Sequence, residues 1–297
     1  MIIKIESNDI NKRLDAYLVN VLNKSRSNIE KHIKVGDILV NGDIKKSGYL
    51  LKEGDIINVK EFKEITTVIK EDIPINIVYE DNYLMVINKP SGLVVHPGNG
   101  NESGTLVNGL VNYTDKLSDL NGDFRLGIVH RIDKDTSGLL LISKTNQIHK
   151  LLTDNFKDNV KRKYIALVEG VIKEEKGKIN APIGRDEKDR KKMCVTSKNS
   201  KEAVTNFEVI ERYKNSTLVR CILETGRTHQ IRVHFAYINH PVINDPVYNK
   251  KHVINDYGQL LHAYYLGFTH PITKEFLEFE VQPEEEFTKL LDTFKNS

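Results

Sequence analysis

The segment from Gly127 to Leu140, GIVHRIDKDTSGLL, concentrates side chains that could do chemistry. It places an imidazole, a guanidinium, two carboxylates and two hydroxyls between apolar residues. A buried strand cannot hold so many polar groups cheaply, because each unpaired one costs about 1–3 kcal/mol. We therefore expect a functional loop, anchored by a strand over 139–142. A carboxylate here could attack a sugar carbon or take a proton from it, and composition does not choose between Asp133 and Asp135.

Two further segments combine charge with an apolar pattern. Lys161-Arg162-Lys163-Tyr164 leads into an apolar strand, so Tyr164 could offer an aromatic face or be an ordinary core residue. Stacking of a base on such a face is worth about 1–3 kcal/mol. In the segment 223–235, Gly226 precedes an expected helix whose apolar face holds Ile231 and Phe235. Arg232 then points elsewhere, either toward a partner or to the surface.

Composition limits the class of protein. The chain has 297 residues, of which 39% are hydrophobic and 29% charged, as in a water-soluble protein with a sizeable core. It holds no apolar run of about 20 residues that could span a membrane, and its start does not read as a signal peptide. Two cysteines are too few for a disulfide framework or a structural zinc site. We expect a cytoplasmic protein without a metal.

The positive charge is unevenly distributed. Residues 1–60 carry 11 Lys or Arg against 8 Asp or Glu, whereas the remainder carries 33 of each. The whole net charge of +3 therefore falls in the first fifth of the chain. Such asymmetry favours a small polyanion-binding module joined to a nearly neutral body.

The first sixty residues predict a compact α+β unit. Leu14, Tyr17, Leu18, Val21 and Leu22 form the stripe of an amphipathic helix. Ser25 is the expected N-cap of a second helix, with Ile29 and Ile33 facing inward and Gly36 ending it. Short strands are expected over 38–40 and 56–59, next to Asn41-Gly42 and Gly54-Asp55 turns.

A second domain is expected over 74–297, after a linker over 63–73. Strands outnumber helices and do not alternate with them regularly, which favours a mixed, mainly antiparallel sheet with flanking helices. A basic loop over 185–201 is interpreted as flexible and RNA-facing. Strands are expected over 75–80, 84–88, 164–169, 204–210, 218–223, 261–268 and 276–281, a helix over 228–237, and a helix capped by Thr145 with Ile148, Leu151, Leu152 and Phe156 inward.

The order of residues from His130 to Gly138 resembles the His-Arg-Leu-Asp-x-x-Thr-Ser-Gly signature of the RluA/RluD family of RNA pseudouridine synthases. Ile132 is the one departure. The resemblance implies that Asp133 is the catalytic carboxylate, which leaves Asp135 as a loop-shaping or solvated carboxylate. We expect Thr136, Ser137 and Gly138 to fix the shape of the loop by local hydrogen bonds and backbone freedom, and we interpret His130 as structural.

The same resemblance extends to the two other segments. It implies that Tyr164 packs against the target base, and that Arg232, with Arg227 as runner-up, pairs with Asp133. Arg131 would contact RNA, on its backbone or in the gap left by a flipped base; a surface ion pair is the alternative.

Residues 1–62 resemble the S4 RNA-binding domain. The elements that match are Arg13-Leu14-Asp15, Ser25-Arg26-Ser27, Ile33-Lys34-Val35-Gly36, Val40-Asn41-Gly42 and Gly54-Asp55. Two helices and the following turn would present basic groups to phosphates, which fixes position without reading sequence. The basic residues expected to do so are Arg13, Lys24, Arg26, Lys31 and Lys34, together with Lys45 and Lys46.

Together these resemblances imply an enzyme that converts uridine in RNA to pseudouridine. It would break the N1 glycosidic bond, turn the base, and rejoin it through C5, after flipping the nucleotide out of its stack. Large-subunit ribosomal RNA is the favoured target and transfer RNA the alternative, and the family implies no cofactor. A non-catalytic RNA-binding or ribosome-assembly protein and a base-excising hydrolase are the competing classes. We expect a monomer.

Overall fold

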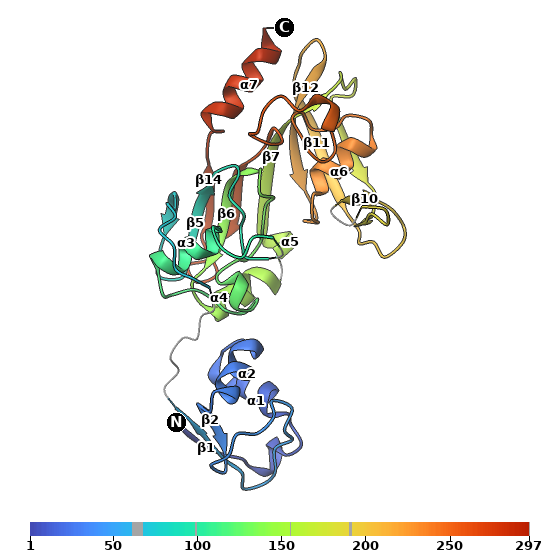
Figure 1. Cartoon of the computed structure of the whole chain (residues 1–297). Coiled ribbons are helices and arrows are strands. Elements are labelled where there is room, and N and C mark those ends of the chain that lie inside the picture. The colour runs from blue at the N-terminus through green and yellow to red at the C-terminus, as the bar shows by residue number, and fades with distance from the viewer. Residues whose placement is uncertain (61–67, 99, 155, 190–191, 297) are drawn as a thin grey trace.

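The computed structural model describes residues 1–60, 68–98, 100–154, 156–189 and 192–296. Its ribbon shows a small N-terminal domain below a larger domain built around one sheet (Figure 1). The chain is therefore α+β, as the sequence predicts.

The N-terminal domain packs two helices on a three-stranded antiparallel sheet of order β1-β3-β2. The side chain of Ser25 accepts a hydrogen bond from the Asn28 N–H, which confirms the predicted N-cap. Leu14, Leu18 and Ile29 lie fully buried in its core. The elements are β1 (Ile2–Lys4), a 3-10 turn (Ser7–Asp9), α1 (Leu14–Leu22), α2 (Arg26–Lys34), β2 (Ile38–Val40) and β3 (Ile56–Val59).

The larger domain is organised by a nine-stranded sheet in which β6 and β13 run parallel and the other described pairs run antiparallel. This confirms the predicted mixed, mainly antiparallel sheet. Its order is β4-β5-β6-β13-β7-β12-β11-β8, with β14 also paired to β13. The strands are β4 (Ile77–Glu80), β5 (Leu84–Lys89), β6 (Ser137–Ser143), β7 (Val160–Glu169), β8 (Lys176–Asn180), β11 (Val204–Arg212), β12 (Ser216–Leu223), β13 (Leu261–Thr269) and β14 (Phe276–Glu280).

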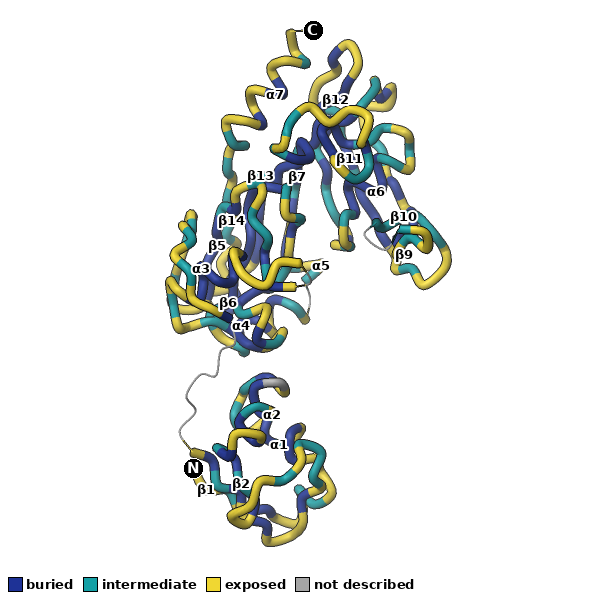
Figure 2. The backbone as a smooth tube through the Cα atoms, viewed as in Figure 1, coloured by how far each residue is buried: buried dark blue, intermediate teal, exposed yellow. Residues whose placement is uncertain are grey.

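Both faces of the central strands are covered. Along β6, Leu140 and Ile142 belong to one hydrophobic cluster, whereas Leu139 and Leu141 belong to another. This alternation follows from the two-residue period of a strand, and every residue of β6 is buried (Figure 2). The helices are α3 (Leu106–Tyr113), α4 (Asn146–Asp154), α5 (Phe156–Asn159), α6 (Gln230–Tyr237) and α7 (Glu285–Lys295), with 3-10 turns at Asp123–Arg125 and Lys250–His252.

Some local predictions were wrong. Leu151 was expected to face inward, yet it is 42% exposed, because the buried face of α4 is formed by Ile148, His149 and Leu152. The segment 185–201 is not wholly a loop, since β9 (Ile183–Arg185) pairs with β10 (Met193–Val195) in a hairpin. Residues 190–191 of the predicted loop lie outside the described residues.

The predicted linker, 63–73, is only partly described by the structure. Residues 61–67 lie outside the described part of the chain, but Val68 packs in the main core of the larger domain. The Ile69 carbonyl accepts a hydrogen bond from the buried Asn108, and Glu71 accepts one from the Gly104 N–H. We therefore propose that the larger domain starts before residue 74, at about Val68.

The two domains touch through polar contacts at the start of α2. The Asp119 carboxylate accepts hydrogen bonds from the N–H and hydroxyl of Ser25 at 3.2–3.3 Å. Asn146 donates to that carboxylate and to the Asn23 carbonyl, at 2.6 and 2.9 Å. These bonds join the α2 end of the small domain to the α4 end of the large one (Figure 1).

Candidate active site

The three residues expected to do chemistry line one pocket. Asp133 comes from the loop before β6, Tyr164 from β7, and Arg232 from α6. The pocket lies where the end of the loop, the strand and the helix converge beside the start of β13. Its lining comprises Arg131, Ile132, Asp133, Thr136, Arg162, Tyr164, Leu223, Gly226, Arg227, Thr228, His229, Gln230, Ile231, Arg232 and Leu261.

Arg232 is held between two carboxylates. Its Nη1 donates to Asp133 Oδ2 at 3.0 Å, so the predicted pairing is present. Its Nε and Nη2 donate to both oxygens of Asp245, at 2.7 and 2.8 Å. Asp245 is fully buried and also accepts the N–H groups of Val247 and Tyr248. The runner-up, Arg227, instead donates to the Glu202 carbonyl.

This network keeps Asp133 ionised. Burial by itself would raise the pKa of the Asp133 carboxyl. The charge that His229 carries only when it is protonated, and at neutral pH the charge and hydrogen bond of Arg232, oppose burial, and the pKa of Asp133 lies below its ordinary value. Arg232 in turn has its pKa raised, because the hydrogen bond to Asp245 and the two carboxylate charges outweigh burial.

Tyr164 and a second arginine share one face of β7. Tyr164 is 5% exposed, and burial raises the pKa of its hydroxyl. Arg162 lies two residues away on the same face, also buried, with its guanidinium 4.7 Å from the centre of the Phe156 ring. Gly226 leaves room for it, since a Cβ there would stand 2.8 Å from Arg162 Nη1. We did not predict Arg162 as part of the site. Its spacing of two residues from Tyr164 along a strand indicates that both side chains lie on the same face.

The loop that carries Asp133 is fixed at its C-terminal end. Thr136 accepts a hydrogen bond from Gln259, and Ser137 is hydrogen-bonded to the buried His262. Gly138 has φ +114°, and a Cβ there would stand 2.2 Å from the Ala263 carbonyl oxygen. A side chain at this position would therefore separate β6 from β13. These contacts fasten the end of the loop to β13 and to Gln259 just before that strand, and they are not local hydrogen bonds within the loop.

A buried lysine holds the same loop from behind. Lys89 ends β5 and is 1% exposed. Its ammonium donates to the carbonyls of Pro90, Leu93 and Lys134 at 2.6–2.9 Å. The bond to the residue after Asp133 ties the loop to the sheet. Burial lowers the pKa of Lys89 to about 7, although nearby carboxylates oppose this. We did not single out Lys89 from the sequence.

Other residues of the signature lie as follows. Asp135 is not among the residues that line the pocket, and burial raises its pKa. His130 accepts a hydrogen bond from the Leu141 N–H, and burial lowers its pKa to about 3, which agrees with a structural role. Arg131 is exposed at the mouth of the pocket, and its Nη1 donates to His96 Nε2 at 2.7 Å.

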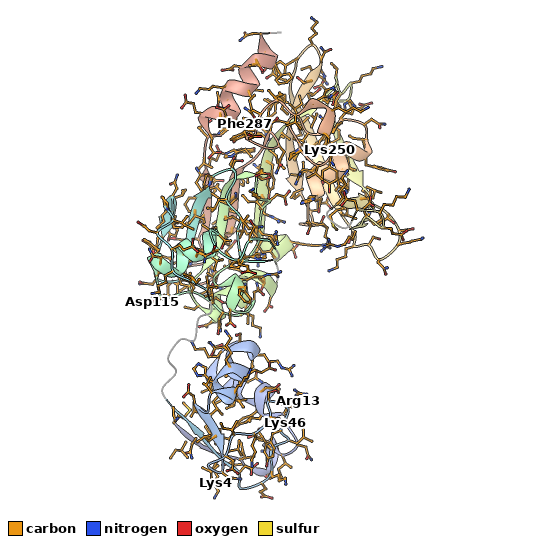
Figure 3. All side chains as sticks on the ribbon, viewed as in Figure 1. Lys4, Arg13, Lys46, Asp115, Lys250 and Phe287 are labelled. Carbon is orange, nitrogen blue, oxygen red and sulfur yellow. The ribbon has the colours of Figure 1, made fainter. Side chains whose placement is uncertain are left out.

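The basic residues of the N-terminal domain are distributed over two surfaces. Arg13 and Arg26 both pair with the buried carboxylate of Asp15, at 2.9 and 2.7 Å. Arg13 and Lys46, both labelled in Figure 3, belong to this domain. Lys31 instead pairs with Asp123 of the larger domain at 2.6 Å, and Lys24 lines the crevice between the domains. Lys34 is exposed.

Over the described ranges, no group of three His, Cys, Asp or Glu could hold a metal ion. Nor does the part of the chain that the structure describes contain a helix long and apolar enough to cross a membrane.

Comparison with known sequences defines the class. The profile of the RNA pseudouridylate synthase family matches residues 83–237, and that of the S4 domain matches residues 12–57. The chain therefore belongs to the RNA pseudouridylate synthase family, with an S4 domain at its N-terminal side. It is an RNA pseudouridine synthase, an enzyme that isomerises uridine in RNA.

Individual relatives cover nearly the whole chain. An uncharacterized RNA pseudouridine synthase, YlyB of Bacillus subtilis, is 46% identical over 96% of this chain and 95% of its own. Ribosomal large subunit pseudouridine synthase D of Neisseria meningitidis serogroup B is 41% identical over 95% of this chain and 79% of its own. The structure of human RNA pseudouridylate synthase domain containing 1 shares the fold, with a TM-score of 0.58 at 24% identity, covering 75% of this chain and 96% of that one.

Asp245→Asn tests whether the second carboxylate holds Arg232 in place. The substitution keeps the shape but removes the charge that faces Nε and Nη2. We expect a loss of about 1.5–3 kcal/mol in the free energy of unfolding, as for a hydrogen bond to a charged group, and slower pseudouridine formation. Urea denaturation and a uridine conversion assay measure the two effects. Asp256→Asn, at an exposed carboxylate, is the control, and unchanged stability and rate in D245N would contradict the assignment.

Lys89→Met tests the buried lysine through the pH dependence of stability. The unfolded chain binds a proton on Lys89 below about pH 10.4, whereas the folded chain does so only below about pH 7. Between these values the unfolded state holds more protons, so stability rises with pH, by at most about 1.4 kcal/mol per unit.

We therefore expect the unfolding free energy of the wild type, minus that of K89M, to increase from pH 7 to pH 9.5. Urea denaturation at several pH values measures it. Lys134→Met, at the exposed neighbouring lysine, is the control for replacing a lysine of the same region by methionine. A flat difference for K89M would refute the lowered pKa.

Proposed function

We propose that Asp133 is the catalytic carboxylate and that large-subunit ribosomal RNA is the substrate. The observation that carries the first part is the geometry of Asp133. Its described hydrogen bonds reach Oδ2, from Arg232, so that Oδ1 is left for chemistry in the pocket. An ionised carboxylate, fixed on one oxygen, is suited either to attack C1′ of the ribose or to take a proton from the sugar.

Tyr164 and Arg162 supply two further features that the reaction needs. Tyr164 presents an aromatic ring in the pocket, on which a flipped uracil can stack. Breaking the N1–C1′ bond leaves the electron pair on the base, and the guanidinium of Arg162 can stabilise that charge. The base then turns and bonds to C1′ through C5. This bond displaces the Asp133 carboxylate if it had attacked C1′, or Asp133 returns the sugar proton if it had taken one, and the proton of C5 is replaced by one on N1. Atoms balance, so product and substrate have the same mass.

The proposed target rests on the relatives and on the S4 domain. Several relatives that match over most of the chain are named as ribosomal large subunit pseudouridine synthase D. The S4-like unit carries the excess positive charge of the chain, as expected for contacts with RNA phosphates. We propose that the enzyme acts on this RNA in the cytoplasm. A monomer suffices, since one chain provides Asp133, Tyr164 and Arg232.

Asp133→Asn tests the catalytic assignment. Asn keeps the volume and can still accept from Arg232, but it is a poor nucleophile and base. We expect loss of pseudouridine formation by at least about 10³-fold with RNA affinity within a few-fold of wild type. Conversion is measured by mass spectrometry of digested RNA and affinity by filter binding.

Asp135→Asn is the matched control, because Asp135 sits two residues away and does not line the pocket. It should retain most of the activity. Conversion by purified D133N at the wild-type rate would refute the assignment. Release of free uracil by the wild type would indicate a hydrolase instead.

Deletion of the gene tests the substrate. We expect specific pseudouridines to disappear from large-subunit ribosomal RNA and to return when the wild-type gene, but not the D133N gene, is restored. Chemical mapping of pseudouridine across ribosomal and transfer RNA is the measurement. Loss confined to transfer RNA would overturn the proposed target while leaving the catalytic assignment in place.

A further inference from the structure

His229 stands beside the oxygen of Asp133 that Arg232 does not hold. It precedes α6 with a left-handed backbone, φ +57° and ψ +20°. Such a conformation is uncommon for a residue other than Gly, although Asn, Asp and His adopt it more often than the rest, and residues in it cluster at functional sites. Its side chain lines the pocket, and its Nε2 lies 3.9 Å from Asp133 Oδ1.

A hydrogen-bond chain sets the position of the proton on this imidazole. The Met193 N–H, in β10, donates to the Tyr248 hydroxyl oxygen at 3.0 Å. The hydroxyl can then donate its own proton to His229 Nδ1, which lies 2.9 Å away. Since burial raises the pKa of Tyr248 to about 12, this hydroxyl is protonated at neutral pH. Nδ1 is then an acceptor, and a neutral imidazole carries its proton on Nε2.

The charge of His229 follows from its surroundings. Burial and the positive charges of Arg232 and Arg131 lower its pKa, whereas the carboxylates of Asp133 and Asp245 raise it, and the net direction is downward. The imidazole is therefore neutral at neutral pH. The pocket thus presents an N–H donor and a carboxylate oxygen acceptor facing each other across 3.9 Å.

This separation selects a particular kind of ligand atom. It is longer than a direct hydrogen bond, yet short enough for a single oxygen to contact both groups. That oxygen must accept from Nε2 and donate to Oδ1, which a hydroxyl can do and a carbonyl cannot. A carboxylate placed to act at C1′ of a ribose necessarily lies near the hydroxyl on the adjacent carbon, C2′.

We propose that His229 and Asp133 Oδ1 together bind the 2′-hydroxyl of the target nucleotide, so that His229 makes the enzyme discriminate RNA from DNA at that position. The inference rests on the catalytic role proposed for Asp133. The 2′-hydroxyl is both donor and acceptor and is the group that distinguishes the two nucleic acids. His229 is thus a specificity-determining residue, and Tyr248 a positioning residue that acts through it.

The test combines His229→Asn with a single 2′-deoxyuridine at the target position of an RNA substrate. Asn tolerates the left-handed backbone but is too short to replace the Nε2–H. For the wild type we expect the deoxy substrate to bind about tenfold more weakly, as for loss of one or two hydrogen bonds. For H229N we expect a similar weakening with the all-ribose substrate and little further loss on removing the hydroxyl. His252→Asn, at an exposed histidine outside the pocket, should discriminate like the wild type.

Two outcomes would overturn the proposal. One is undiminished discrimination by H229N; the other is a wild-type His229 whose proton is found on Nδ1 by nitrogen-15 NMR. Tyr248→Phe provides a second variant. Loss of the hydroxyl should allow the imidazole proton to move to Nδ1, which identifies the His229 signal in the NMR spectrum. The same variant should discriminate less between the ribose and deoxyribose substrates. The role of Asp133 is judged separately by the loss of conversion in D133N, so either idea can fail alone.

Discussion

One guanidinium shared by two carboxylates is the interaction on which the site depends. Asp245 is fully buried and Asp133 largely so, and Arg232 is 4% exposed between them. Burying a carboxylate without a partner is costly, and Arg232 is the charged partner of both acids. The bidentate contact with Asp245 fixes the plane of the guanidinium, and this plane decides which oxygen of Asp133 is held. Stability and catalytic geometry therefore rest on the same side chains.

The fold brings these groups together from distant parts of the chain. Asp133 enters on a loop fastened by Lys89 behind it and by the close approach of Gly138 to β13. Tyr164 comes from β7, which pairs with β13 on one side and β12 on the other. Arg232 comes from α6, which follows β12. The pocket thus forms near the middle of the sheet, where β13 and β7 are neighbours. Asp133 comes from the β6 side of this point and Arg232 from the β12 side.

The sequence could predict what depends on local pattern or on a contiguous motif. The stripe of Leu14 and Leu18 and the cap at Ser25 fixed the first helices, and the resemblance of three short segments pointed to Asp133, Tyr164 and Arg232. Asp245 could not be found in this way, because it sits in an irregular loop and its importance arises only from tertiary contact. The same holds for Lys89, whose partner Lys134 is 45 residues away.

The ion pairs of the N-terminal domain do not use up its capacity to bind RNA. Arg13 and Arg26 share the buried Asp15, and the hydrogen bond from Arg13 contributes most to lowering the pKa of Asp15 to about 2. Each guanidinium has five N–H groups and spends some of them on Asp15, so others remain for phosphate oxygens, and both side chains are about half exposed. Asp15 therefore holds the guanidinium groups of Arg13 and Arg26 in a fixed orientation, which lowers the conformational entropy lost when they bind phosphate. Because Ser25 and Asn146 tie this domain to the larger one, the phosphates it binds would lie in a defined direction from the pocket.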